Sequence, residues 1–267
     1  MSELDTATEL ASRDVSGRVV IVTGAGSGMG RATALLLAES GAAVACWDLN
    51  GDSAEETVGL ASGGSHDGSG SVIAMAADVA DVKSVDRAVA ATREALGPID
   101  SLVNNAGVSI LAPLDSPEWP DAWERTLAVN LTGPANVLRS CLADLRRNGD
   151  GRVVNIASTE GLGATRYISP YTASKHGLIG FTRSAAFELA EAGVTVNCVC
   201  PGSVHTGMTA IIPDEHKERF ARRRVPMRRY GEPVEVAHMT LSLLLPAASY
   251  TTGAVLAVDG GLTIQNT

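Results

Sequence analysis

The chain has 267 residues, of which 45% are apolar and 19% are charged, a composition that excludes a disordered protein. Aromatic residues make up only 4%, so the core is expected to consist of small and branched aliphatic side chains. A net charge of −9 argues against a non-specific nucleic-acid surface. No stretch approaches membrane-spanning length and no apolar run opens the chain, so we expect a cytoplasmic protein without nucleic-acid or membrane partners.

Residues 1–16 are polar and are expected to form a flexible tail, whereas residues 17–267 show no break that would divide them into two domains. Short apolar runs alternate with amphipathic stretches along this single domain. The expected strands are 18–24, 42–48, 71–78, 99–107, 151–158, 194–202 and 251–262, and the expected helices are 29–40, 53–61, 83–96, 118–147 and 170–192. Strands rich in β-branched residues that alternate with helices predict an α/β fold with a doubly wound parallel sheet of about seven strands.

Two polar segments interrupt this alternation. Residues 61–70 are rich in glycine and serine, and we interpret them as a surface loop with a solvated His66. Residues 203–232 follow the carboxyl end of a predicted strand, where open α/β sheets bind ligands, and are expected to form a mobile substrate-side lid. A basic cluster in the lid is either a solvated or inter-subunit surface or a docking patch for an anionic substrate tail. It consists of Arg222, Arg223, Arg224, Arg228 and Arg229.

The four cysteines, Cys46, Cys141, Cys198 and Cys200, lack the spacing of metal ligands, so no metal site is expected. Cys198 and Cys200 share one face of a predicted strand, where side chains two residues apart do not easily form a disulfide. We therefore expect four free thiols.

A glycine-rich turn, TGAGSGMG at 23–30, joins the first predicted strand directly to a helix. Gly24, Gly28 and Gly30 allow a sharp turn in which backbone N–H groups approach a pyrophosphate, and the helix amino terminus adds a favourable partial charge. Ser27 lies within the turn, and Met29 occupies the place of the third glycine in the common dinucleotide fingerprint. The turn predicts a dinucleotide site, although taken alone it would indicate only a tight turn.

Asp48 ends the second predicted strand, where a carboxylate can accept hydrogen bonds from both adenosine ribose hydroxyls and would repel a 2′-phosphate. Neither Ser27 nor Leu49 offers a compensating cation, so the sequence favours NAD over NADP. Asp78 and Val79 follow the third strand, and the Asp78 carboxylate lies either beside the adenine amino group or at a helix cap.

Tyr171 and Lys175 are four residues apart at the start of a predicted helix, so both side chains lie on one face. A phenol with a pKa near 10 is a poor acid or base at neutral pH unless its phenolate is stabilised, and a neighbouring ammonium group provides that stabilisation. Tyr167 lacks such a partner and is expected to line the pocket. The pair predicts a tyrosine general acid/base.

Together these motifs resemble those of the classical short-chain dehydrogenase/reductase family, from about Gly17 to the end of the chain. In order they are TGAGSGMG, Asp78-Val79, NNAG at 104–107, Asn130, Ser158, YTASK at 171–175 and the Pro-Gly pair at 201–202. The resemblance implies a Rossmann-type fold, a homotetramer, and hydride transfer between NAD(H) and a small-molecule secondary alcohol or ketone.

The resemblance also implies a role for each matching residue. Ser158 would hydrogen-bond the substrate oxygen, and Lys175 would bind the nicotinamide ribose and tune Tyr171. Asn130 would hold a water in a proton relay, although alone it indicates only a helix irregularity. The other cofactor contacts would be Asn105, Ala106 and Gly107 on the adenosine side, and Pro201, Gly202, Val204 and Thr206 beside the nicotinamide.

Two rival functions remain at this point. The first is a 3-oxoacyl-thioester reductase whose arginine cluster docks a carrier protein or the phosphates of coenzyme A. The second is a non-catalytic binding protein on the same scaffold, which the presence of all four catalytic residues disfavours. The substrate pocket is expected to be lined by 159–168 and 203–212, where Arg166 and His205 are possible specificity groups.

Overall fold

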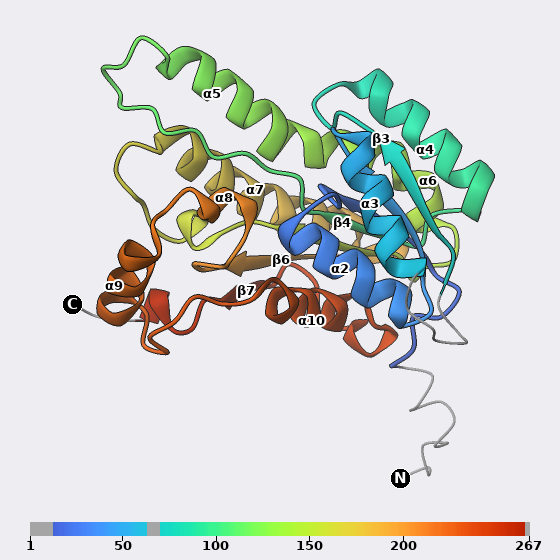
Figure 1. Cartoon of the computed structure of the whole chain (residues 1–267). Coiled ribbons are helices and arrows are strands. Elements are labelled where there is room, and N and C mark those ends of the chain that lie inside the picture. Colours follow the sequence, from blue (N-terminus) through green and yellow to red (C-terminus); the bar gives the residue numbers. More distant parts are fainter. Residues whose placement is uncertain (1–12, 63–69, 265–267) are drawn as a thin grey trace.

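The computed structural model describes residues 13–62 and 70–264, which form one α/β unit around a seven-stranded sheet (Figure 1). The predicted tail up to residue 12 and His66 lie outside the described residues. The strands are β1 (Val19–Thr23), β2 (Ala43–Asp48), β3 (Val72–Ala76), β4 (Ser101–Asn104), β5 (Arg152–Ile156), β6 (Thr195–Pro201) and β7 (Val255–Val258). They are parallel and ordered β3-β2-β1-β4-β5-β6-β7, so the predicted doubly wound, Rossmann-type sheet is confirmed.

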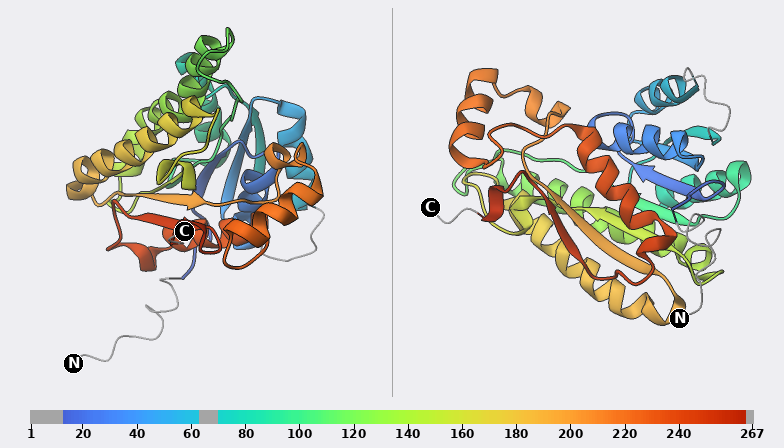
Figure 2. Two further views of the ribbon diagram at one scale, coloured as in Figure 1. Left: turned by 90° about the vertical axis from the view of Figure 1, so that its left-hand side faces the viewer. Right: turned by 90° about the horizontal axis from the view of Figure 1, so that it is seen from below.

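Helices cover both faces of the sheet (Figure 2). On one face, α2 (Gly28–Glu39), α3 (Gly51–Ser62) and α10 (Pro233–Leu244) pack on β-branched side chains of the central strands. On the other face lie α4 (Val82–Leu96), α6 (Gly133–Arg146) and α7 (Ser169–Leu189). Because β1, β4, β5 and β6 are buried along their whole length, they lack the polar alternation of a sheet with one wet face.

The long helical region expected at 118–147 is divided in two. Helix α5 (Trp119–Leu127) and helix α6 are joined by a widened π turn over Ala128–Thr132. Pro134 has no N–H, so it cannot donate the usual helical hydrogen bond to the carbonyl of Asn130, four residues earlier. The widened turn carries Asn130 in a buried position and directs its amide toward the loop after β4.

The segment predicted as a lid leaves the sheet after β6 and returns to it before α10. It contains two helices, α8 (Gly207–Ala210) and α9 (Asp214–Arg224), at one end of the molecule (Figures 1 and 2). Its two ends meet, because the N–H of His205 donates to the carbonyl of Gly231 at 3.0 Å and the N–H of Gly231 donates to the carbonyl of Ser203 at 2.9 Å. The excursion therefore starts and finishes at one place on the sheet.

Within the residues that the structure describes, no helix is both long and apolar enough to cross a membrane. All four cysteines are buried free thiols, as expected. The ordered core extends toward the amino terminus as far as Val15, whose side chain is buried between the sheet and its helices.

Candidate active site

A cavity of about 360 Å³ lies where the carboxyl ends of the strands meet, at the switch point between β1 and β4. Its walls come from the residues that follow β1 to β6 and from the first turn of α7. The predicted residues that line it are Gly24, Ser27, Gly28, Met29, Asp48, Leu49, Asp78, Val79, Asn105, Ala106, Gly107, Tyr171, Lys175 and Thr206. Residues separated by up to 182 positions in the sequence thus share one cavity, because parallel strands end at a common edge.

The glycine-rich turn has the backbone that only glycine adopts freely. Gly24 and Gly28 have φ values of +65° and +53°, in the left-handed region. A Cβ at Gly30 would lie 2.1 Å from the carbonyl oxygen of Gly24, so this glycine lets the helix start directly under the turn. The turn presents its backbone and the amino terminus of α2 to the cavity, which suits a pyrophosphate.

Asp48 ends β2 and ties the glycine-rich turn to the second strand. Its carboxylate accepts hydrogen bonds from the N–H of Gly26 at 2.9 Å and from the N–H of Asn50 at 3.0 Å. Leu49 beside it is exposed. The nearest basic side chain of the turn, Arg31, is paired with Glu56 at 2.7 Å.

The Asp78 carboxylate lines the cavity and also accepts a hydrogen bond from the N–H of Ala80 at 2.9 Å. Helix α4 is capped by a different residue, since the Asp81 carboxylate accepts from the N–H of Lys83 at 3.0 Å. Asp78 therefore shapes the turn before the helix without capping it, and it lies on the wall of the cavity.

Asn105 locks the loop after β4 against the glycine-rich turn. Its amide donates to the carbonyls of Thr23 at 2.9 Å and Gly24 at 3.2 Å. In return the Thr23 hydroxyl accepts from the N–H groups of Asn105 and Ala106, both at 3.0 Å. These bonds fix the relative position of the two loops that line the adenosine side.

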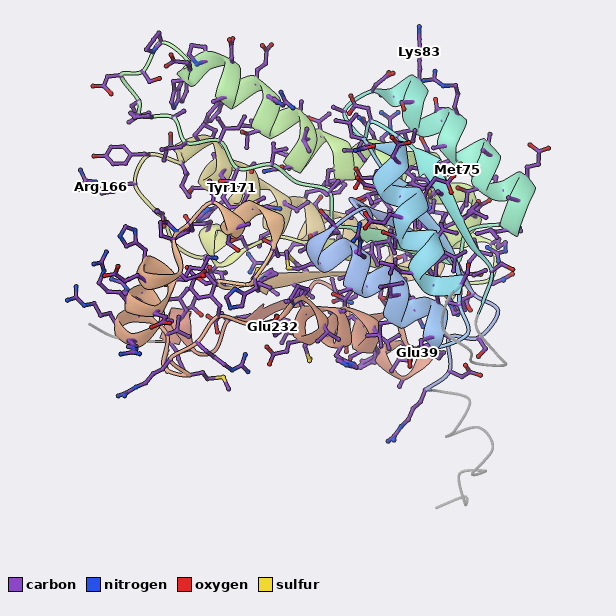
Figure 3. All side chains as sticks on the ribbon, viewed as in Figure 1. Glu39, Met75, Lys83, Arg166, Tyr171 and Glu232 are labelled. Atoms are coloured by element: carbon purple, nitrogen blue, oxygen red, sulfur yellow. The ribbon has the colours of Figure 1, made fainter. Side chains whose placement is uncertain are left out.

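Tyr171 and Lys175 lie in the first turns of α7, on the inner side of the cavity. Lys175 is only 3% exposed, and its ammonium group donates to the carbonyl of Ile156 at 2.8 Å and lies 5.5 Å from the centre of the Tyr171 ring. In Figure 3, Tyr171 lies within the molecule whereas Arg166 is at its edge. Burial lowers the pKa of Lys175 to about 8.

Burial also decides the pKa of Tyr171, which lies above its ordinary value. A hydrogen bond with the Ser158 side chain lowers this pKa, but the desolvation of the phenolate outweighs it, and the nearby Glu160 carboxylate raises the pKa further. Lys175 does not offset this in the chain alone, because its own pKa of about 8 lies below that of Tyr171, so the lysine has lost its charge before the phenol ionises.

Ser158 and Glu160 belong to the turn after β5. The Ser158 hydroxyl accepts from the N–H of Glu160 at 3.1 Å, so it caps this turn as well as reaching Tyr171. The Glu160 carboxylate accepts from the hydroxyls of Thr165 at 2.6 Å and Thr172 at 3.0 Å. Glu160 thereby ties the predicted substrate loop to the start of α7.

The Asn130 side chain is fully satisfied. Its amide oxygen accepts from the N–H of Val108 and its amide nitrogen donates to the carbonyl of Val108, both at 2.8 Å, and it also donates to the Ser174 hydroxyl at 3.0 Å. Asn130 therefore joins the loop after β4 to helix α7, at the residue before Lys175.

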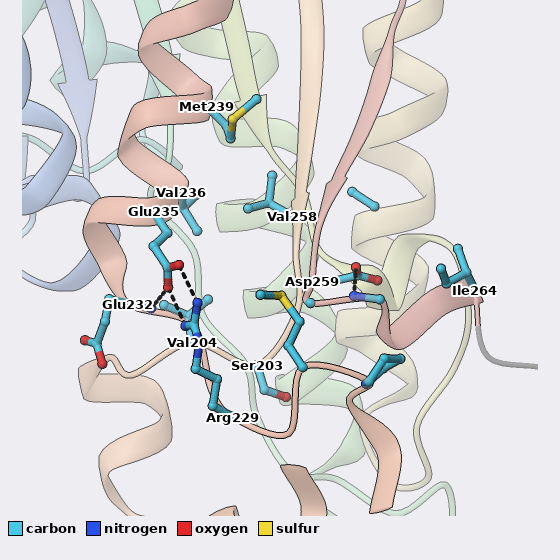
Figure 4. Close-up of a pocket in the computed structure, with 16 residues that line it drawn as sticks. Ser203, Val204, Arg229, Glu232, Glu235, Val236, Met239, Val258, Asp259 and Ile264 are labelled. Carbon is cyan, nitrogen blue, oxygen red and sulfur yellow. Dashed lines mark hydrogen bonds and ion pairs between the residues drawn. The ribbon is translucent and has the colours of Figure 1, made fainter. Parts of the chain in front are cut away.

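Six predicted residues are not on the wall of this cavity, and two of them are Asn130 and Ser158. Gly30 is buried beneath the turn, Pro201 and Gly202 do not reach the cavity wall, and Val204 lines a second cavity. That second cavity, about 580 Å³, lies between α10 and β7, and the bidentate pair of Arg229 with Glu235 spans one side of it (Figure 4).

Sequence reasoning missed several residues of the first cavity. They are Ala77, Val108, Arg125, Val129, Ile156 and Ala157, whereas Gly207 and Met208 fall in the segment 203–212 that was predicted to line the substrate pocket. Most of them adjoin predicted residues, so widening each motif by one position would have found them. Arg125, in the last turn of α5, carried no such signal.

The residues present fit a nicotinamide dinucleotide. Gly24 and Gly28 have left-handed backbone and no side chain that would cover the turn. The same cavity is lined by the Asp48 carboxylate, the half-buried Tyr171 and the buried Lys175. Among the described residues, no group of three or more potential ligands could hold a metal ion.

Comparisons with known proteins agree with this geometry. A family model described as enoyl-(acyl carrier protein) reductase matches residues 24–263. The chain is 39% identical to a subunit of (2S)-[(R)-hydroxy(phenyl)methyl]succinyl-CoA dehydrogenase from Thauera aromatica, over 92% of this chain and 97% of the relative. It is 37% identical to the 3-oxoacyl-[acyl-carrier-protein] reductase of Thermotoga maritima, over 94% of this chain and 99% of the relative.

Among solved structures, levodione reductase superposes with a TM-score of 0.87 at 34% identity, covering 94% of this chain and 99% of that chain. A short-chain type dehydrogenase/reductase from Mycobacterium marinum gives a TM-score of 0.88 at 28% identity, covering 96% and 99%. The similarity extends over nearly the whole chain.

Proposed function

Because this chain belongs to the short-chain dehydrogenase/reductase family, whose members are nicotinamide-dependent oxidoreductases, we propose that it transfers a hydride between NAD(H) and a secondary alcohol or ketone. The catalytic residues of this proposal are Asn130, Ser158, Tyr171 and Lys175. The observation that carries it is the Tyr171–Lys175 pair beside Ser158, in which Lys175 is buried and Tyr171 half-buried, on the wall of a cavity that Asp48 also lines.

In this mechanism the bound nicotinamide supplies or accepts the hydride. Ser158 donates a hydrogen bond to the substrate oxygen, and Tyr171 removes the hydroxyl proton during oxidation and returns it during reduction. Lys175, buried beside the Tyr171 ring, stabilises the phenolate as it forms. Most of the rate enhancement then comes from positioning and from stabilisation of the oxyanion.

Asp48 supports NAD as the cofactor. Its carboxylate at the end of β2 can accept from both ribose hydroxyls, and it would repel a 2′-phosphate. Arg31, one residue after the glycine-rich turn, forms an ion pair with Glu56 at 2.7 Å. We expect the rate with NADH to exceed the rate with NADPH under identical conditions.

The test of the proposal is the Tyr171→Phe variant, assayed at 340 nm with a panel of secondary alcohols and ketones. Turnover should be lost while NADH binding, followed by fluorescence, stays nearly unchanged. Tyr167→Phe is the matched control, because Tyr167 is half-exposed and its hydroxyl is bonded only to Arg166. Retained turnover in Tyr171→Phe would refute the proposed chemistry.

A 3-oxoacyl thioester is the second candidate substrate class, and two observations favour it. Relatives named for acyl-carrier-protein and CoA substrates are 37–39% identical to this chain. Within the described residues, Arg223, Arg224 and Arg228 of the basic cluster are exposed and form no ion pair. Acetoacetyl-CoA in the same substrate panel separates this class from simple ketones.

By family resemblance we also propose a cytoplasmic homotetramer, which analytical ultracentrifugation would test.

A further inference from the structure

Exposed apolar side chains gather in three loops, 105–118, 157–168 and 202–213, which follow β4, β5 and β6. Among the described residues, eleven leucine, isoleucine, valine and methionine side chains are exposed, and five of them come from these loops. The loops contain fewer than one in six of the described residues, so an even scatter would give them about two. A cluster of exposed apolar side chains on a folded chain marks a binding surface. The five are Leu111, Leu114, Leu162, Met208 and Ile211, with exposed fractions between 45% and 87%.

The three loops border the cavity that contains the catalytic pair. Each loop contributes to the cavity wall, with Val108 after β4, Ala157 after β5 and Met208 after β6. The first two loops are tied together, because the N–H of Ala112 donates to the carbonyl of Tyr167 at 2.7 Å. Figure 1 shows the loops before α5 and α7 and helix α8 at the same end of the molecule. The five exposed side chains therefore form an apolar rim beside the cavity.

The loops that carry the rim offer no free cation to an acidic substrate group. Arg166 is the one lysine or arginine in these three loops. Its guanidinium donates to the Tyr167 hydroxyl at 2.9 Å and lies 5.0 Å from the centre of the Tyr167 ring. The Glu160 carboxylate is engaged in turn by the hydroxyls of Thr165 and Thr172. A substrate group that lies between the loops thus meets mainly hydrocarbon, and its binding is hydrophobic.

We propose that the substrate carries a bulky apolar group beside its reacting carbon, and that this group packs on the rim while the substrate oxygen lies at Tyr171. The assignment rests on the hydride transfer proposed above. It narrows the substrate from any secondary alcohol or ketone to one with an alkyl or aryl group of several carbons. Each methylene group buried against the rim should raise kcat/KM roughly three- to fourfold.

A series of methyl ketones from butan-2-one to octan-2-one tests this on the unmodified protein, with NADH consumption followed at 340 nm. The four added methylene groups should raise kcat/KM roughly 100-fold in total. Equal kcat/KM values along the series would overturn the apolar rim and leave hydride transfer standing.

A double variant, Leu114→Asn with Ile211→Asn, makes two side chains of the rim polar. Both positions are exposed, so the substitutions should change stability little. The gain from butan-2-one to octan-2-one should shrink to roughly 10-fold, because fewer methylene groups are then buried against hydrocarbon. The control Leu60→Asn, at an exposed position of α3, should keep the full gain. An unchanged gain in the double variant, together with a smaller oligomer in ultracentrifugation, would overturn the proposal and identify the rim as a subunit contact.

Binding can be measured apart from chemistry in the Tyr171→Phe variant, by displacement of the neutral dye Nile red. Octan-2-one should displace the dye at a concentration roughly 100-fold lower than butan-2-one. Preferential displacement by octan-2-one, without turnover of any ketone by the wild-type chain, would refute hydride transfer and support the apolar rim. Equal displacement by both ketones would overturn the rim.

Discussion

Lys175 should make the stability of the cofactor-free chain rise with pH in the alkaline range. Burial lowers its pKa from 10.5 to about 8, so between these values the folded chain releases a proton that the unfolded chain still holds. The unfolded state then binds more protons, and the free energy of unfolding increases with pH. At about 1.4 kcal/mol for each pKa unit, the gain between pH 7 and pH 10 is about 2–3 kcal/mol. This corresponds to roughly 5–10 °C in melting temperature.

Buried thiols act in the opposite direction and must be separated from this effect. Burial raises the pKa of Cys46 and of Cys141 to about 12, whereas both ionise near 8.5 in an unfolded chain. Above that pH the unfolded state holds fewer protons at these positions, and stability falls. The pH curve of the wild-type chain therefore contains both contributions.

The Lys175→Met variant isolates the lysine contribution. Thermal unfolding of both chains without cofactor, at equal protein concentration and from pH 7 to pH 10, gives a difference curve in which the contributions of Cys46 and Cys141 cancel. We expect the wild-type chain to gain about 2–3 kcal/mol over this range relative to the variant. Lys83→Met, which removes a lysine that points away from the molecule in Figure 3, should give a flat difference curve. A flat curve for Lys175→Met would refute the reasoning.

Three further predictions concern the cavity. Asp48→Ala should lower kcat/KM for NAD roughly 10- to 100-fold, because charge-assisted hydrogen bonds to the ribose are lost. The ratio of kcat/KM for NADP to that for NAD should rise, and an unchanged ratio would contradict this role of Asp48. Gly30→Ala should abolish NADH binding in a fluorescence titration, because the new Cβ would lie 2.1 Å from a backbone oxygen. The control Gly59→Ala places its Cβ where no atom lies within 4 Å, and it should stabilise the chain by about 0.5–1 kcal/mol. Glu160→Gln removes a charge that raises the pKa of Tyr171, so the acid limb of the kcat/KM profile for alcohol oxidation should move to lower pH, and an unmoved limb would count against it.

The sequence could predict the fold because its local signals agree with one another. The run Val19–Thr23 is buried along its whole length, and the glycine-rich turn follows it directly, so strand, turn and helix are each indicated by adjacent residues. The Tyr171–Lys175 spacing is likewise a local property of a helix. Features that depend on one element and its immediate neighbours were therefore accessible without a structure.

Features that depend on distant contacts were not accessible. The carbonyl of Ile156 holds the Lys175 ammonium, and this bond crosses from β5 to α7. Likewise, only the register of three strands shows that Ser101, Arg152 and Thr195 are neighbours in the sheet. Val204 illustrates the same limit, since its place in the chain suggested the cofactor cavity whereas its side chain lines the second one.

The paired ends of the segment between β6 and α10 have a consequence for how such a chain can change. Ser203, His205 and Gly231 close the excursion with backbone hydrogen bonds, and the neighbouring rings of His205 and Tyr230 add a side-chain contact at its base. Ala221 and Val225 are buried within it, whereas Arg222, Arg223 and Arg224 between them are exposed. Related chains can therefore differ at these exposed positions while the sheet keeps its register and α10 keeps its place.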